Sequence, residues 1–291
     1  MVQSKKIALT VDDLPIHGDK IESYSRLEIA KNFIQAFKKF DLPPVVGFAN
    51  MQATLDSSEG LEVIHYWSES GHLLGNHTFS HLDLECVSEG EFINDIELNE
   101  KYLSCLPHFK RYFRYPFLSE SQSFIKRAFV KEYLENRNYI VAPVTVDFFD
   151  FMWNTAFSKC LAHKNGTGKE YLQNTFITAA AEAADQSILT ARKIFSCDVK
   201  QIMLLHMGMA TSLFIEPLIE HLMSLGYEFI TLEEALSDEL YQEDFYIPER
   251  NGLNFLQQAA QAYHTSMPPY SETLKKQVLR YAYNLPSTIS L

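Results

Sequence analysis

Two adjacent carboxylates, Asp12 and Asp13, directly follow an apolar run that ends at Val11. At the end of a buried strand their negative charges repel each other, so a nearby cation is their natural stabiliser. A helix N-cap or a simple turn is the alternative interpretation of such a pair. The position at a strand end, before Leu14-Pro15, favours a cation site.

A pair of histidines four residues apart, His77 and His81, follows another short apolar run. We expect one helical turn to place both imidazoles on the same side, from which they reach one metal ion. Chance pairs are common among 10 histidines, so the pair alone is a weak signal. Together with a carboxylate from a strand end, it supplies three nitrogen and oxygen ligands and leaves a position for water.

Further ionisable side chains lie at the ends of later candidate strands. Arg114 stands among aromatic residues, where an unpaired charge is costly, so it needs a carboxylate partner. Asp147 and Asp150 alternate with aromatic residues, and His206 ends an apolar run. The alternatives are a turn beside an ordinary core for the aspartates and a structural role for the histidine.

The elements that must position these side chains alternate between strand and helix. Such alternation predicts a parallel sheet with helical crossovers, open or closed into a barrel, with the chemistry at the carboxyl ends of the strands. Apolar runs predict strands at 6–11, 45–48, 73–77, 112–117, 139–146, 202–205 and 227–231. Helical spacing predicts helices at 27–40, 62–70, 89–106, 124–134, 169–195, 214–224, 253–263 and 271–283.

Composition restricts the class of protein. The chain has 291 residues, 46% of them hydrophobic, which excludes a largely disordered chain. A formal net charge of −12, without a basic stripe, argues against nucleic acid or an anionic membrane surface as partner. We expect no membrane insertion, because no apolar run is long enough to span a bilayer. The four cysteines lack metal-type spacing, so thiolate zinc is not expected, and their disulfide state is open.

Taken in order, these motifs resemble the polysaccharide deacetylase family (carbohydrate esterase family 4, which includes chitin and peptidoglycan deacetylases). The resemblance covers about residues 5–238. It implies an α/β fold, an irregular (β/α)7 TIM-like barrel in residues 1–238, and we expect residues 239–291 to be a helical C-terminal extension packed on the barrel. Two positions depart from the family pattern: Val11 replaces an aromatic residue, and Phe151 stands where tryptophan is usual.

The resemblance also implies a role for each matched residue. Asp12 is the expected general base, held by Arg114, and His206 is the expected general acid, oriented by Asp150. The expected metal ligands are Asp13, His77 and His81. The expected substrate contacts are Phe117, through its backbone N–H, Leu204 in the acetyl pocket, and Phe148 and Trp153, whose rings stack on sugars.

The function that these roles imply is removal of N-acetyl groups from an N-acetyl-sugar polysaccharide or oligosaccharide by metal-activated water. The implied cofactor is one divalent ion, with zinc as first expectation and cobalt, manganese and nickel as alternatives. One alternative function is hydrolysis of small cyclic amides or ureides on the same fold, and another is an inactive glycan-binding relative. The expected location is the periplasm or another extracytoplasmic site, with the leader absent from this chain, and the cytoplasm is the alternative.

Two residues have open interpretations. His17, four residues after Asp13, lies near enough to approach the metal, but we expect a histidine of a surface loop. Spacing alone does not decide whether Asp147 or Asp150 contacts His206. The oligomeric state is also open.

Overall fold

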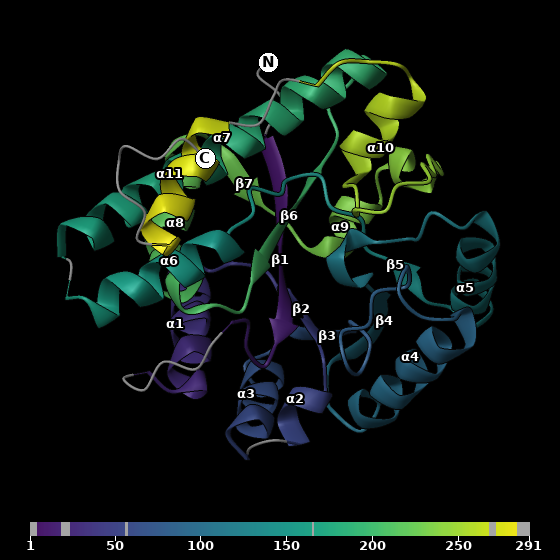
Figure 1. Cartoon of the computed structure of the whole chain (residues 1–291), viewed down its shortest axis with the longest axis horizontal. Helices are drawn as coiled ribbons and strands as arrows, with labels where there is room; N and C mark the ends of the chain where they lie inside the picture. The colour runs from purple at the N-terminus through teal and green to yellow at the C-terminus, as the bar shows by residue number, and fades with distance from the viewer. Residues whose placement is uncertain (1–4, 19–23, 56–57, 165, 268–271, 284–291) are drawn as a thin grey trace.

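The structure is a computed structural model that describes residues 5–18, 24–55, 58–164, 166–267 and 272–283. Within these residues the sheet has seven parallel strands, in the order β5-β4-β3-β2-β1-β6, with β7 also paired to β1 (Figure 1). The strands are β1 (Lys5–Leu14), β2 (Val46–Ala49), β3 (Leu73–Asn76), β4 (Phe109–Phe113), β5 (Ile140–Val141), β6 (Gln201–His206) and β7 (Tyr227–Phe229). The predicted irregular (β/α) barrel is confirmed.

Helices surround this sheet. In the described part of the chain they are α1 (Arg26–Lys39), α2 (Gln52–Leu55), α3 (Ser58–Glu69), α4 (Glu89–Leu103), α5 (Phe124–Asn136), α6 (Phe151–Ala162), α7 (Gly166–Phe195), α8 (Met209–Ser224), α9 (Leu232–Leu236), α10 (Phe255–Ala262) and α11 (Glu272–Tyr283), with 3-10 turns η1 (Pro116–Leu118) and η2 (Glu239–Gln242). Residue 271, the first of the last predicted helix, lies outside the described residues.

Strand β1 is the centre of the fold because it is apolar on both faces. Ile7, Ala8, Leu9 and Val11 are each at most 3% exposed, as in a parallel strand covered on both sides. It pairs with β2, β6 and β7. Its carboxyl end therefore lies next to the ends of its neighbours, where the ionisable residues of the sequence stand.

The sheet departs from the prediction where the chain leaves β4 and β5. The predicted strand 112–117 ends at Phe113, and a 3-10 turn begins at Pro116. The predicted strand 139–146 is only two residues long, because Pro143 has no N–H to donate to a neighbouring strand. Val146 alone bridges to Met203 of β6, so the barrel is irregular between β5 and β6. Helix α6 was not predicted.

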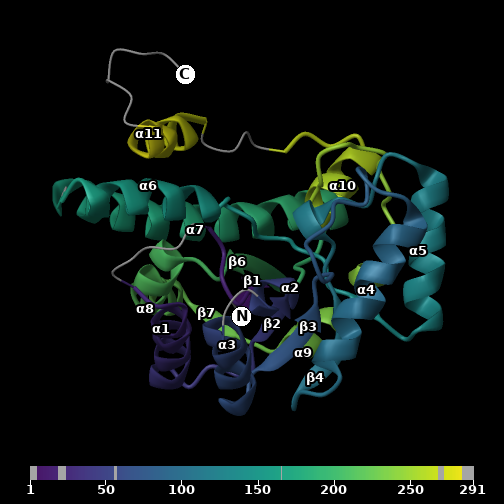
Figure 2. The ribbon, with the colours of Figure 1, turned by 60° about the horizontal axis from the view of Figure 1, so that its bottom comes forward.

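The C-terminal helices lie on the helical layer of the barrel. Helix α10 packs on α7, and α11 packs on α6 and α7, as Figure 2 shows. A cluster around Ala191, Val199, Phe255 and Leu256 joins α7 and α10. The division into a barrel at 1–238 and an extension at 239–291 stays a prediction.

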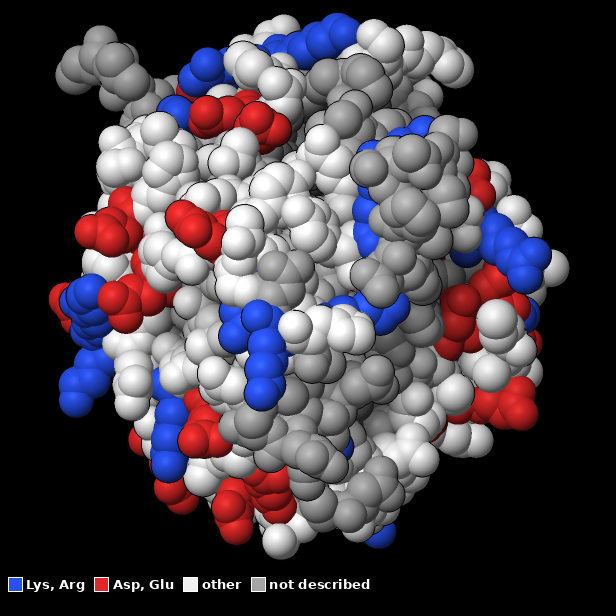
Figure 3. Space-filling view, turned by 60° about the vertical axis from the view of Figure 1, so that its left-hand side comes forward, with Lys and Arg blue, Asp and Glu red and all other residues white. Residues whose placement is uncertain are grey.

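The surface carries both signs of charge. Figure 3 shows acidic and basic side chains interspersed on one face, without a continuous basic stripe there. No helix in the described part of the chain is both long and apolar enough to cross a membrane.

Candidate active site

The residues predicted to do chemistry meet at the carboxyl ends of the central strands. Asp12 of β1 is paired in register with His206 of β6, so the two lie on neighbouring strands. His77 directly follows β3, and Arg114 directly follows β4. Parallel strands end at the same edge of the sheet, which is why residues more than a hundred positions apart converge here.

Asp13, His77 and His81 form one cluster. Asp13 Oδ1 lies 3.4 Å from His77 Nε2 and 3.2 Å from His81 Nε2. Tetrahedral bonds of about 2.0–2.1 Å to a zinc ion put neighbouring ligand atoms about 3.3 Å apart. The donor atoms therefore have the spacing and the chemistry of a two-histidine, one-carboxylate metal site.

The hydrogen bonds of this cluster test whether it suits a cation. His77 Nδ1 lies 2.8 Å from the carbonyl oxygen of Arg114, which only accepts, so Nδ1 carries the proton and Nε2 of a neutral His77 presents a lone pair. That lone pair faces Asp13 Oδ1, a buried oxygen with no hydrogen-bond partner among the described residues. A divalent ion between these atoms would satisfy both, so the residues present fit a metal.

The segment that carries the two histidines is a loop, and the predicted helical turn is wrong. Thr78 and His81 have positive φ angles of 62° and 57°, which a helix does not contain. Buried amides hold the loop. Asn76 Oδ1 accepts from the Thr78 N–H at 2.9 Å, and Asn50 Nδ2 donates to the Thr78 carbonyl at 3.0 Å. The imidazoles thus converge through loop geometry that spacing along the sequence does not reveal.

The Asp12 carboxylate is buried and paired with Arg114. Arg114 Nη1 lies 3.3 Å from both oxygens of Asp12, and the two side chains are 1% and 3% exposed. The remaining guanidinium donors reach the Ala142 carbonyl at 2.7 Å and Thr10 Oγ1 at 3.1 Å. The guanidinium also lies over the Phe48 ring, 4.6 Å from its centroid. The carboxylate partner predicted for Arg114 is therefore Asp12.

His206 is oriented by Asp150. Its Nδ1 lies 2.6 Å from Asp150 Oδ1, and its backbone N–H donates to Asp150 Oδ2 at 2.8 Å. Thr211 donates a further bond to the same carboxylate. Burial by itself lowers the pKa of His206, but the negative charge of Asp150, with smaller contributions from Asp13 and Asp12, raises the pKa to about 10. Asp147 instead accepts from the Phe149 N–H, so the open question is resolved in favour of Asp150.

We expect the variant Asp150→Asn to move the alkaline limb of the pH–rate profile to lower pH. The carboxylate raises the pKa of His206, so its loss lowers that pKa, and a neutral imidazole cannot donate a proton above it. The measurement is kcat against pH for the wild type, Asp150→Asn and Asp147→Asn. An alkaline limb that stays in place in Asp150→Asn, or that moves equally in Asp147→Asn, contradicts the assignment.

The aromatic residues near the site divide into two groups. Phe148 and Trp153 are 0% and 1% exposed and pack on Phe176, so the expectation that they stack on sugars is wrong: they belong to the core. Phe151 is 39% exposed, with its ring 5.7 Å from that of His206. Phe117 is 59% exposed, with its ring 4.5 Å from that of His81. Exposed rings therefore lie beside His81 of the Asp13–His77–His81 cluster and beside His206. Leu204 is buried on β6.

His17 belongs to the site, and the expectation of a surface-loop residue is wrong. Its Nδ1 lies 2.6 Å from Asp13 Oδ2, and its ring centroid is 4.8 Å from that of His206. Its backbone N–H donates to the Met207 carbonyl, which brings the loop after β1 against the end of β6. Burial raises the pKa of Asp13, but its contacts with His17, His77 and His81 hold that pKa well below its ordinary value.

We expect His17→Ala to weaken binding of a divalent ion by about 10- to 100-fold, because a hydrogen bond to the second oxygen of a ligating carboxylate fixes its orientation. His17→Asn keeps a donor near the position of Nδ1 and should retain most of the affinity. Equilibrium dialysis with zinc measures the effect, with His264→Ala, an exposed histidine, as control. Equal affinities for His17→Ala and the wild type would show that His17 does not orient Asp13.

Comparisons with known proteins agree with this fold. The family model of polysaccharide deacetylase matches residues 2–133. No curated protein matches the chain. The chitin deacetylase of the fungal pathogen Colletotrichum lindemuthianum is a structural neighbour with a TM-score of 0.56 and 23% identity, over 81% of this chain and 89% of the other.

Two bacterial structures show the same likeness. PdaA of Bacillus subtilis, a family 4 carbohydrate esterase, gives a TM-score of 0.53 at 17% identity, over 81% of this chain and 82% of the other. A family 4 pseudoenzyme from Bacillus anthracis gives a TM-score of 0.53 at 16% identity, over 80% of this chain and 66% of the other. At such identities the likeness establishes the fold alone.

Proposed function

The predicted resemblance to the polysaccharide deacetylase family is confirmed, and from this premise we propose that the protein is a metal-dependent N-deacetylase of N-acetylated glycans. The observation that carries the proposal is the convergence of Asp13, His77 and His81 beside a buried Asp12–Arg114 pair and an Asp150–His206 pair. Family 4 also contains pseudoenzymes, but every residue that the resemblance requires for ligation and proton transfer stands in place here.

Asp12, Asp13 and Arg114 carry the first half of the reaction. Asp13, His77 and His81 would hold a divalent ion, which would lower the pKa of a water molecule and polarise an acyl oxygen. Asp12 accepts the proton of the water that attacks the acetamide carbon, and Arg114 holds the Asp12 carboxylate in position at 3.3 Å. The backbone N–H of Phe117 donates to the acyl oxygen as it becomes negative.

His206 carries the second half. The C–N bond breaks only if the departing nitrogen takes up a proton, because an amine anion is a poor leaving group. A His206 pKa of about 10 keeps the imidazole charged near neutral pH, so it can donate that proton. The products are a free amine on the sugar and acetate.

The exposed surroundings of the site favour a glycan over a small ring. His81 and His17 have side chains that are 30% and 28% exposed, so the site opens to solvent. The exposed rings of Phe117 and Phe151 border it and can stack on sugars. A site for a small cyclic amide would instead enclose its substrate.

Acetate release from zinc-loaded protein tests the proposal. The substrates are oligomers of N-acetylglucosamine from dimer to hexamer, N-acetylated peptidoglycan fragments and a small cyclic ureide. We expect acetate from at least one N-acetylated glycan and no opening of the ureide. Ureide hydrolysis without acetate release would support the same-fold alternative, and glycan binding without turnover would support an inactive relative.

A further inference from the structure

The loop that carries Phe117 has an unusual backbone. Phe117, Leu118 and Ser121 have positive φ angles of 58°, 53° and 70°, although none of them is glycine. Side chains with a Cβ rarely adopt this conformation, and it persists where the surrounding structure holds it. The Phe117 ring lies against His81, so a shift of this loop would also displace the surroundings of His81.

Gly252, in the C-terminal extension, packs directly against the backbone of this loop. A Cβ at Gly252 would lie 1.9 Å from the Phe117 carbonyl oxygen and 2.5 Å from the Leu118 carbonyl carbon. Both of these neighbours are backbone atoms, which cannot rotate away as the end of a side chain can. The extension and the loop therefore fit together only because residue 252 has no side chain.

Tyr246, also in the extension, forms hydrogen bonds with the C-terminal end of the loop. Its hydroxyl donates to the carbonyl oxygens of Ser121 and Gln122, at 3.2 Å and 3.0 Å. Its ring packs on Phe124, with centroids 6.0 Å apart, and the Arg127 guanidinium lies 4.5 Å from its centroid. These contacts hold the loop where it leads into α5.

A charged network adds two further connections. Arg127 donates to Asp244 at 3.0 Å and to Glu120 at 2.7 Å. Gln258 of α10 donates to Glu120 at 3.3 Å and to the Leu253 carbonyl at 3.1 Å. Glu120 thus lies between the helix that follows the loop and the helix of the extension.

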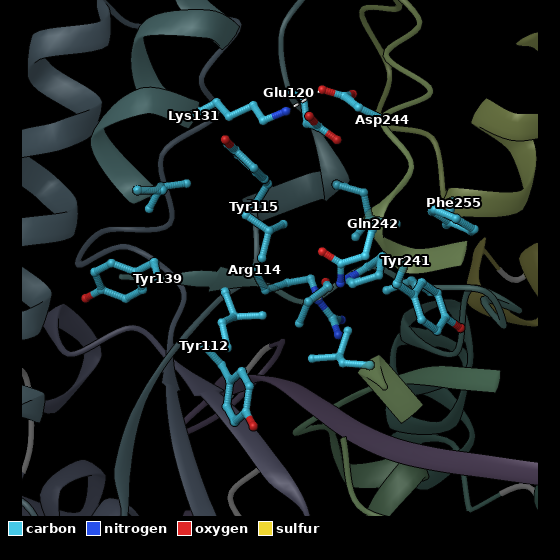
Figure 4. Close-up of a pocket in the computed structure, with 18 of the residues that line it drawn as sticks. Tyr112, Arg114, Tyr115, Glu120, Lys131, Tyr139, Tyr241, Gln242, Asp244 and Phe255 are labelled. Atoms are coloured by element: carbon cyan, nitrogen blue, oxygen red, sulfur yellow. Dashed lines mark hydrogen bonds and ion pairs between the residues drawn. The ribbon is translucent and has the colours of Figure 1, made fainter. Parts of the chain in front are cut away.

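A cavity lies behind the loop. Its volume is about 600 Å³, and Arg114, Glu120, Gln242 and Asp244 are among its lining residues. Figure 4 shows Asp244 directed toward Lys131 and beside Glu120, and Gln242 at the cavity that Arg114 also lines. Because a cavity rather than packed side chains lies there, the contacts at its rim carry more of the restraint on the loop.

We propose that residues 244–258, here named the clamp segment, hold Phe117, Leu118 and Ser121 in their left-handed conformation and so position the Phe117 N–H for the reaction. The role of the clamp segment rests on the proposed function, since the acyl oxygen is what that N–H meets. Gly252 and Tyr246 are its positioning residues.

Gly252→Ala and Tyr246→Phe test the clamp segment in the full chain. We expect Gly252→Ala to lower kcat by roughly 100-fold, since a displacement of about 1 Å in a reacting geometry has that effect. KM and zinc affinity should stay near those of the wild type, and the variant should remain folded at the assay temperature although its unfolding midpoint falls. Tyr246→Phe should act in the same direction and less strongly. Gly90→Ala is the matched control, because a Cβ there meets nothing within 4 Å.

Hydrogen exchange of the amides at 117–122 gives a second readout, independent of activity. We expect faster exchange in Gly252→Ala and Tyr246→Phe than in the wild type and Gly90→Ala. Unchanged exchange and kcat in both variants would overturn the clamp, as would a fall in kcat that only follows loss of folding or zinc binding. If the wild type releases no acetate, the proposed function fails, and the exchange data alone decide whether the extension holds the loop.

Discussion

Asp12→Asn is expected to lower kcat by about 10²- to 10⁴-fold while zinc binding persists, because an amide of the same shape cannot accept the proton of the attacking water. Asp12 is 2% exposed, and Arg114 keeps its bonds to Ala142 and Thr10 in the variant. Rates of acetate release and zinc affinity are measured together. Glycan affinity should survive, since only proton transfer is removed.

The matched control is Asp185→Asn, which removes an aspartate that pairs with Lys5 at the opposite end of β1. Its kcat should remain within a small factor of that of the wild type. Asp12→Asn will also weaken the charge pairing of Arg114, so unfolding midpoints are compared at the assay temperature. A folded, zinc-loaded Asp12→Asn protein with the activity of the wild type would exclude Asp12 as the base.

His206→Gln is expected to lower the rate of amide hydrolysis by about 10²- to 10⁴-fold, because the departing amine loses its proton donor. The loss should be far smaller with an aryl acetate, whose phenolate leaves without a proton. Asp12→Asn should lose both activities, because water must be deprotonated in either reaction. The two variants are therefore distinguished by comparing an amide with an aryl ester.

His221→Gln, near the end of α8, is the matched control for this substitution and should leave both activities unchanged. An equal loss of amide and ester hydrolysis in His206→Gln would show that His206 acts on a step that precedes departure of the amine.

The sequence predicted the order of strands and helices, and it predicted that the site residues lie at the ends of strands. Both depend on local patterns. The apolar run of β1 and the spacing of α1 are readable from a single segment. The lengths of β4 and β5 were wrong, because pairing with a neighbour decides where a strand ends. Helix α6 was missed because the aromatic residues from Phe151 to Trp153 were interpreted as the wall of a binding site and not as the start of a helix.

Most ionisable residues of the candidate site were predicted, but their geometry was not. The convergence of His77 and His81 depends on positive φ angles at Thr78 and His81, and buried amides of Asn50 and Asn76 hold that loop. Neither the backbone angles nor these hydrogen bonds can be read from the spacing of residues along the sequence. His17 was four residues from Asp13, and only the fold of the loop after β1 shows that it reaches the carboxylate.

The same limit explains the two aromatic residues assigned to sugar binding. Phe148 and Trp153 have the composition of a sugar-stacking surface, but their packing on Phe176 places them inside the protein. A single sequence does not tell which face of an aromatic segment is buried. The ring that does reach the surface beside His206 is that of Phe151.

Zinc titration of chelator-treated protein, followed by elemental analysis, tests the cluster of Asp13, His77 and His81 most directly. All four cysteines are free and three of them are exposed, so Cys86→Ser, Cys105→Ser and Cys197→Ser are needed as controls for binding to thiols. We expect one tightly bound ion per chain in the wild type and in these controls, and loss of that ion in Asp13→Ala and His77→Ala. An ion bound with unchanged affinity in Asp13→Ala and His77→Ala, or no stoichiometric binding in the wild type, would contradict the metal site.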